Sequence, residues 1–365
     1  MIELLQVSGC QVWWEGNCLA VDASHIGNWQ IPVQIASRMR SSIYFLGALL
    51  GRIGRAELPY PGGCVLGARP VDMHLQAMQD MGASVEEVNG NIVARTRGLV
   101  GREITLRFPS VGATENIILA AINAKGRTVI HNGAREPEIE ELCRFFREKG
   151  AWIRQWPDGR IEIAGGRELK DTTYSLAADR IVAGTYLLAA AMTDGRITLG
   201  RMPGHHMEEV LRVLSRMGIE MEWQGSDLTV DCRGRRRGLE LLETAPYPGF
   251  PTDLQSPMMT LLAVTEGRCC IRENIFEARF KTAAQLKNMG ADIEVRGKEA
   301  WVTGVPRLNG AWVEAEELRG AAALFLAGLN AAGLTKIRGC RYVSRGYENI
   351  CENLKNLGAD IRMIE

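Results

Sequence analysis

The chain has 365 residues with 43 acidic and 43 basic side chains, so its formal net charge is zero. A general nucleic-acid or anionic-membrane binder would carry a basic excess, and the balance argues against both classes. The longest apolar runs, such as residues 321–329, are too short to span a bilayer. Nine scattered cysteines without a CxxC pair argue against zinc ribbons and thioredoxin chemistry and favour a reduced, cytoplasmic protein.

Six segments share one pattern, in which apolar residues at helical spacing precede a glycine and then alternating residues typical of a strand. They begin at residues 2, 75, 142, 210, 283 and 350, and the last ends in its first strand. A glycine after the last helical turn supplies the positive φ that this position needs. We therefore expect helices to end just before six glycines: Gly9, Gly82, Gly150, Gly218, Gly290 and Gly358.

A second pattern, a helix of small apolar residues followed by a glycine and a strand, occurs five times, over residues 41–58, 113–132, 182–200, 256–274 and 319–339. Its alanines predict close packing at a crowded centre. The two patterns together define a unit of roughly 70 residues that reads β-α-β-α-β-β. The first unit lacks its first helix, so the periodicity predicts about 35 to 50 residues before residue 1. We expect an α/β (α+β) fold with three units in each of two domains, residues 1–176 and 177–365.

Several motifs carry a resemblance over the whole chain: "PGGCVLGARPVDMH", "PSVGATENIILAA", "AREPEIEELC", "ADRIVAGTY", "FPTDLQ", "FEARF", "ELRGAAAL" and "RGYENI". They resemble the UDP-N-acetylglucosamine 1-carboxyvinyltransferases, a family of enolpyruvyl transferases. The resemblance implies an inside-out α/β barrel built from βαβαββ units in each domain, with the active site in the cleft between the domains. We also expect a monomer that uses no cofactor and no metal and that binds neither nucleic acid nor membrane.

The implied reaction moves the enolpyruvyl group of phosphoenolpyruvate to the 3′-hydroxyl of UDP-N-acetylglucosamine and releases phosphate, the first committed step of peptidoglycan synthesis. Such chemistry needs cations for a carboxylate and a phosphate, a base for the hydroxyl, and an acid for the enol methylene. Arginine suits both anions because its planar guanidinium binds them through two parallel hydrogen bonds.

By this resemblance, Cys64 is the acid of the addition step and the thiol that fosfomycin alkylates. A loop thiol near arginines has a lowered pKa and is reactive, whereas an isolated loop cysteine is more often a packed or exposed residue. Arg69 matches an arginine that faces phosphoenolpyruvate, and Arg40 matches another active-site arginine. An arginine before an apolar helix is otherwise most often a solvated residue.

Two stretches resemble the nucleotide site of the family. Pro70, Val71, Asp72 and Met73 match the lining of the uridine site, although "RPVDM" also reads as a helix start with proline at its first position. Ser110, Val111 and Gly112 match contacts to the diphosphate. A Ser-Val-Gly turn is equally typical of ordinary helix capping, and both roles are compatible because a helix N-terminus attracts anions.

Asp253 in "FPTDLQ" matches the carboxylate that contacts the sugar hydroxyl and serves as general base, although Thr252 or Asp253 could instead cap the next helix. Ile275 and Arg279 match residues beside the sugar nucleotide, with a structural ion pair as the competing role for Arg279. Two further residues match the arginines that close on the phosphate, and the second of them is also assigned a catalytic role: Arg319 and Arg345.

The chain departs from the family pattern in three respects. Glu317 stands where the family has aspartate, and Val182 where it has glutamate. The family's first-unit lysine and asparagine would precede residue 1, so we expect lower turnover than in a longer relative. Two alternatives stay open: a degenerate paralogue that binds UDP-N-acetylglucosamine without turnover, and an enolpyruvylshikimate-phosphate synthase, against which the cysteine loop argues.

Overall fold

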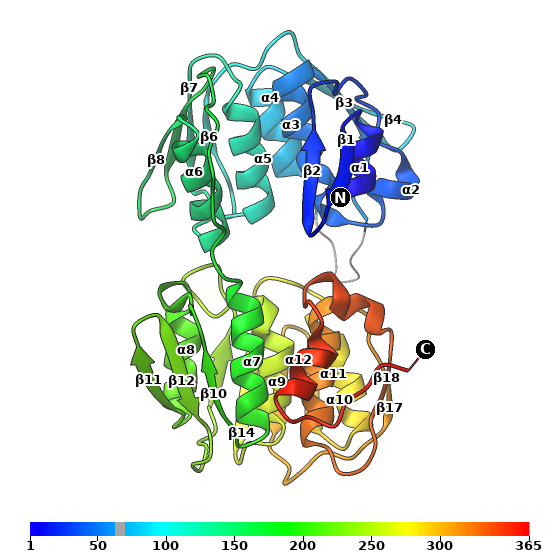
Figure 1. Cartoon of the computed structure of the whole chain (residues 1–365), viewed down its shortest axis with the longest axis vertical. Helices are drawn as coiled ribbons and strands as arrows, with labels where there is room; N and C mark the ends of the chain where they lie inside the picture. Colours follow the sequence, from blue (N-terminus) through cyan, green and yellow to red (C-terminus); the bar gives the residue numbers. More distant parts are fainter. Residues whose placement is uncertain (63–69, 365) are drawn as a thin grey trace. The chain divides into compact units, whose positions relative to one another are not determined.

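The computed structural model describes residues 1–62 and 70–364, which divide into two compact units (Figure 1). Unit 1 comprises the described residues up to 176, and unit 2 comprises residues 177–364. Among the described helices, none is both long and apolar enough to cross a membrane.

Unit 1 contains three sheets with the strand orders β1-β2, β3-β5-β4 and β6-β7-β9-β8. Its elements are α1 (Ile2–Val7), β1 (Gln11–Glu15), β2 (Cys18–Asp22), α2 (Val33–Ala36), η1 (Arg40–Ile43), α3 (Tyr44–Ile53), β3 (Arg55–Pro59), α4 (Asp72–Asp80), β4 (Ser84–Val88), β5 (Asn91–Arg95), β6 (Glu103–Thr105), α5 (Val111–Ala121), β7 (Arg127–His131), α6 (Pro137–Glu148), β8 (Trp152–Gln155) and β9 (Ile161–Ala164).

Unit 2 repeats this plan with the strand orders β10-β12-β11, β13-β14-β16-β15 and β17-β18. Its elements are α7 (Arg180–Met192), β10 (Arg196–Leu199), η2 (Gly204–His206), α8 (Glu208–Arg216), β11 (Glu220–Gln224), β12 (Asp227–Asp231), β13 (Leu241–Glu243), η3 (Thr252–Leu254), α9 (Gln255–Leu262), β14 (Arg268–Arg272), η4 (Arg279–Lys281), α10 (Thr282–Asn288), β15 (Asp292–Arg296), β16 (Glu299–Thr303), β17 (Trp312–Glu314), α11 (Leu318–Asn330), β18 (Lys336–Arg338), η5 (Cys340–Arg345) and α12 (Ile350–Asn356).

The predicted repeat is present, and it is complete in two places. The order β-α-β-α-β-β runs from β6 to β9 in unit 1 and from β13 to β16 in unit 2. In both copies the first strand pairs parallel with the second, and the later pairs are antiparallel. All six predicted glycines follow the end of a helix with φ between +86° and +102°, as the capping pattern requires.

The small-residue helices lie at the centre of each unit, as their alanines predict. In unit 2, α7, α9 and α11 pack against one another, with β10–β12 on one side and β17 and β18 on the other (Figure 1). Every residue of α9 is buried. In unit 1, α3 packs on α5 so closely that a Cβ on Gly47 would lie 2.4 Å from the Asn116 carbonyl oxygen.

One predicted strand is absent from the described part of the chain. The alternating residues 359–364 form no strand. A strand is stabilised by a hydrogen-bonded neighbour, and among the described strands β18, the one before α12, pairs with β17 alone. The expectation at this position was therefore wrong.

Candidate active site

A carboxylate held between two arginines is the central feature of the site in unit 2. Asp253 lies in the short helix η3, where its Oδ1 accepts a hydrogen bond of 2.6 Å from Arg279 Nη2. Its Oδ2 accepts one of 2.8 Å from Arg319 Nη2. Burial alone would raise the pKa of Asp253, but the two guanidinium groups outweigh it and hold the pKa below its ordinary value. Asp253 is therefore ionised at neutral pH.

Neither Thr252 nor Asp253 caps the next helix, so that alternative was wrong. Helix α9 begins after Leu254, which makes no side-chain capping bond. The Thr252 hydroxyl instead donates to both carboxylate oxygens of Glu273 at 3.0 Å. Both side chains therefore bond to groups outside α9, and the Asp253 carboxylate points toward Arg279 and Arg319.

Arg279 has the structural ion-pair role that competed with substrate contact. Its side chain is 1% exposed. Besides bonding Asp253, it donates to the Thr252 carbonyl oxygen from Nε at 3.1 Å and from Nη2 at 3.0 Å, and its Nη1 lies 3.6 Å from Glu317. Arg279 therefore fixes the backbone at Thr252 and the carboxylate of Asp253.

Arg319 is the more accessible of the two arginines, with 14% of its side chain exposed. Its Nη1 donates to the Tyr347 hydroxyl at 3.3 Å, and this hydroxyl lies 2.9 Å from the Thr185 hydroxyl on α7. Arg319 lies at the start of α11, whose N-cap is Glu317. Glu317 accepts from the backbone N–H groups of Arg319 and Gly320, so the longer side chain at this position works as a helix cap.

Glu273 is a residue of this site that sequence reasoning missed. It is 1% exposed, and its Oε1 accepts from the backbone N–H groups of Ile275 at 2.9 Å and Phe276 at 3.0 Å. Together with the Thr252 bonds, these contacts join the loop of Ile275 to the loop of Asp253. An acidic residue directly after the apolar strand β14 was the available signal.

The unit 1 candidates gather at the N-termini of α4 and α5. Ser110 is the N-cap of α5, and its Oγ accepts from the Ala113 N–H at 3.3 Å. Val111 and Gly112 form the first turn. A Cβ on Gly112 would lie 3.3 Å from Cε1 and 3.5 Å from Nε2 of His74, so the imidazole packs directly on this turn.

Helix α4 begins later than the sequence pattern indicates. Its N-cap is Val71 and its first residue is Asp72, so Pro70 precedes the cap and the placement of proline at the first helical position was wrong. Val71 is buried, whereas Met73 is partly buried. Arg107 forms an ion pair with Asp72, and this hydrogen bond lowers the pKa of Asp72.

The remaining candidates differ in surroundings. Arg40, the first residue of η1, is partly buried, and its charge contributes to the lowered pKa of His74. Arg345, the last residue of η5, is exposed, and its side chain makes no hydrogen bond or ion pair with any described residue. Cys64 and Arg69 lie outside the described residues.

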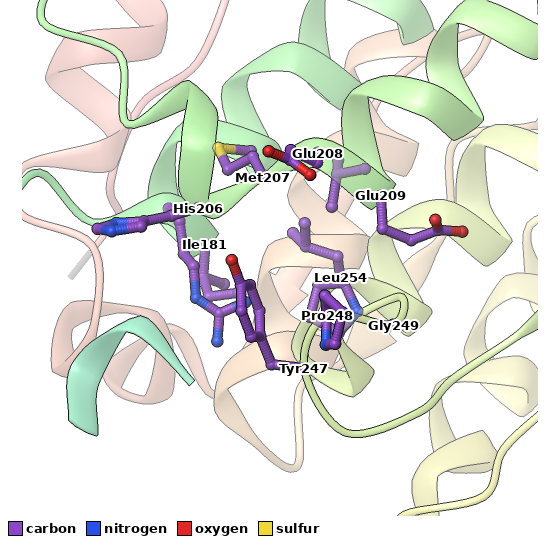
Figure 2. Close-up of a pocket in the computed structure, with 12 residues that line it drawn as sticks. Ile181, His206, Met207, Glu208, Glu209, Tyr247, Pro248, Gly249 and Leu254 are labelled. Atoms are coloured by element: carbon purple, nitrogen blue, oxygen red, sulfur yellow. The ribbon is translucent and has the colours of Figure 1, made fainter. Parts of the chain in front are cut away.

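A small pocket in unit 2 is lined in part by Leu254, the residue after Asp253, but it does not have room for a substrate. Figure 2 shows His206, Met207, Tyr247 and Leu254 around it. Its volume of about 10 Å³ holds about one water molecule. In residues 1–62 and 70–364, no group of three or more histidine, cysteine or acidic side chains is arranged to hold a metal ion.

Comparison with known proteins gives the family. The model of the EPSP synthase (3-phosphoshikimate 1-carboxyvinyltransferase) family matches residues 1–354. The enolpyruvyl transferase NikO from Streptomyces tendae superposes with a TM-score of 0.86 at 26% identity, covering 99% of this chain and 86% of that one. The EPSP synthase of Acinetobacter baumannii, at 18% identity, shares the fold with a TM-score of 0.73, covering 100% of this chain and 88% of that one. Fold and family model together define a carboxyvinyltransferase.

Curated relatives narrow this class. A UDP-N-acetylglucosamine 1-carboxyvinyltransferase 2 of Caldanaerobacter subterraneus is 44% identical over 99% of this chain and 87% of its own length. A UDP-N-acetylglucosamine 1-carboxyvinyltransferase of Synechocystis is 42% identical over 100% of this chain and 84% of its own. The chain belongs to the UDP-N-acetylglucosamine 1-carboxyvinyltransferase family, which confirms the resemblance, the predicted fold class and the transferase class.

Proposed function

We propose that this protein transfers the enolpyruvyl group of phosphoenolpyruvate to the 3′-hydroxyl of UDP-N-acetylglucosamine and releases phosphate, as the first committed step of peptidoglycan synthesis. The names of its relatives support this pair of substrates. The observation that carries the chemistry is Asp253, a carboxylate kept ionised by Arg279 and Arg319.

The reaction adds the hydroxyl oxygen to C2 of phosphoenolpyruvate while C3 gains a proton, and it then breaks the C2–phosphate oxygen bond while C3 loses a proton. We assign to Asp253 the acceptance of the hydroxyl proton during the first step. An ionised carboxylate accepts a hydrogen bond from the hydroxyl before the reaction and takes the proton as the new C–O bond makes that hydroxyl acidic. The guanidinium groups orient the carboxylate, and Arg319 has further N–H donors for an anion.

The unit 1 residues fit the nucleotide. The α5 N-terminus at Ser110, Val111 and Gly112 has backbone N–H groups and a positive dipole end, which suit the diphosphate. We assign the lining of the uridine site to Pro70, Val71, Asp72 and Met73. The remaining proposed contacts to phosphoenolpyruvate and to the sugar come from further residues in both units: Arg40, Arg69, Arg345 and Ile275. Cys64 is proposed to protonate C3.

Phosphate release from phosphoenolpyruvate tests the proposal. Release should require UDP-N-acetylglucosamine, and Asp253→Asn should lower kcat by about 10²- to 10⁴-fold, the usual contribution of a general base. The matched control is Asp292→Asn, because Asp292 is exposed at the start of β15. Unchanged turnover in Asp253→Asn would contradict the assigned base.

Two further measurements separate the alternatives. Release with shikimate 3-phosphate instead of UDP-N-acetylglucosamine would favour the synthase. Binding of UDP-N-acetylglucosamine without release would favour a non-catalytic paralogue. Mass spectrometry should find fosfomycin attached to the wild type and not to Cys64→Ala, and labelling of the variant would refute the assignment of Cys64.

We further propose that the protein works in the cytoplasm, where thiols stay reduced. The eight cysteines among the described residues are all free, which supports this.

A further inference from the structure

Asn116 is a fully buried amide at the centre of unit 1, on helix α5. Its Oδ1 accepts a hydrogen bond from the backbone N–H of Gly47 at 2.8 Å. Its Nδ2 donates to the Ile43 carbonyl oxygen at 3.0 Å and lies 3.0 Å from Nδ1 of His74. The side chain thus links η1, α3, α4 and α5.

These partners determine which way the amide faces. The Gly47 N–H can only donate, so it requires the amide oxygen, and the Ile43 carbonyl can only accept, so it requires the amide nitrogen. The atom that faces His74 is therefore the NH₂ group. Since NH₂ only donates, Nδ1 of His74 must be its acceptor and carries no proton. The imidazole is then neutral, with its proton on Nε2.

The surroundings of His74 agree with a neutral ring. Its side chain is 4% exposed. Burial, together with the charge of Arg40, lowers the pKa of His74 to about 4, and Asp72 opposes this shift more weakly. The ring is uncharged at neutral pH.

Nε2 lies at the N-terminus of α5. Built on the backbone of Gly112, a Cβ would be 3.5 Å from Nε2, so this nitrogen packs on the first turn of the helix. No described residue forms a hydrogen bond with Nε2. An N–H donor of a buried histidine, without a partner among the described residues, therefore lies beside the backbone N–H groups of a helix start, where an anion is favoured.

We propose that Asn116 is a positioning residue that holds His74 in the Nε2–H tautomer, so that His74 donates a hydrogen bond to an anionic oxygen of the nucleotide diphosphate at the start of α5. The nature of this ligand rests on the proposed function, whereas the tautomer depends on unit 1 alone. The role of Asn116 is to exclude the other tautomer, in which Nε2 would present a lone pair to the phosphate.

NMR of the free, ¹⁵N-labelled full chain tests the tautomer, with His74→Gln used to assign the His74 signals. The expected spectrum between pH 6 and 8 shows Nε2 protonated and Nδ1 unprotonated. Asn116→Asp should raise the pKa of His74, because a carboxylate then faces Nδ1. Asn123→Asp, an exposed asparagine just after α5, is the matched control and should leave that pKa unchanged. A proton on Nδ1 in the wild type would overturn the proposal.

Calorimetry with UDP tests the donor. Glutamine places an amide N–H near the Nε2 position, whereas asparagine places its amide near Nδ1. A hydrogen bond to a charged group contributes about 1.5–3 kcal/mol, so His74→Asn should bind UDP about 10- to 150-fold more weakly. His74→Gln should stay within a few-fold of the wild type. Both variants should bind uridine, which lacks the diphosphate, as the wild type does.

The outcomes separate this inference from the proposed function. A wild type that does not bind UDP would overturn the ligand and with it the proposed function. If the wild type binds UDP but His74→Asn binds it equally tightly, only the role of His74 would be overturned. Near-ultraviolet circular dichroism checks that each variant is folded before binding is compared.

Discussion

Replacing Arg279 by methionine tests whether the Asp253 site depends on its buried cation. Arg279 makes two hydrogen bonds to the Thr252 carbonyl and one to the Asp253 carboxylate. At about 1 kcal/mol for each bond to the neutral carbonyl oxygen and about 1.5–3 kcal/mol for the bond to the carboxylate, their loss totals about 3.5–5 kcal/mol. Breaking a buried ion pair from one side costs a similar amount.

The same change at Arg319 should cost less. Arg319 makes one bond to Asp253 and a longer one to the Tyr347 hydroxyl, and it is partly accessible to solvent. The same scale gives about 2.5–4 kcal/mol for these two bonds, and solvent access to Arg319 lowers this loss. Arg296→Met is the matched control, because Arg296 pairs with Glu294 at the surface and should cost less than about 1 kcal/mol.

The assay is urea unfolding followed by hydrogen exchange of peptides from α9 and α11, which report unit 2 directly. A double-mutant cycle with Asp253→Asn isolates the pairing energy of residues 253 and 279, and we expect a coupling of about 1–3 kcal/mol. An Arg279→Met variant within 1 kcal/mol of the wild type, or an Arg319→Met variant that is less stable than Arg279→Met, would refute the reasoning.

Three further predictions concern unit 1. Gly47→Ala should destabilise unit 1 by about 1–3 kcal/mol in urea unfolding, because the new methyl group would overlap the Asn116 backbone oxygen. The control is Gly51→Ala, whose methyl group would lie 3.3 Å from its nearest neighbour, and it should change stability little. Ser110→Ala should cost about 1 kcal/mol through the lost cap, measured by thermal unfolding, and a value near zero would contradict the capping bond. Burial raises the pKa of Glu115. The free energy of unfolding of the wild type should therefore fall relative to that of Glu115→Gln as the pH rises through this pKa, and the two free energies should converge below about pH 4. Parallel curves of stability against pH would refute this.

Local features of the fold followed from the sequence. The six helix-ending glycines require a positive φ whatever surrounds them, so their pattern alone placed the helix ends. The Ser110 cap is equally local, since it joins residues three positions apart. The strand expected at residues 359–364 failed because a strand depends on a partner elsewhere in the chain.

The site was predictable where a motif identified each residue separately, as for Asp253, Arg279 and Arg319, which the structure brings together. Residues whose role arises from distant contacts were missed. Asn116 bonds a backbone group 69 positions away, and no periodicity points to such a pairing. Tyr347 belongs to this class as well, because its hydroxyl lies 2.9 Å from that of Thr185, 162 positions away.

The polar chain of unit 2 has a consequence for how the repeats divide their work. Thr185, Tyr347, Arg319, Asp253 and Arg279 follow one another in hydrogen-bonding contact. They belong to all three copies of the unit 2 repeat, from α7 to the segment before α12. The copies build equivalent helices and strands, yet the polar groups that they contribute to this chain differ from copy to copy. A single copy, however well folded, would carry a fragment of a site, and duplicating it would not produce a second one.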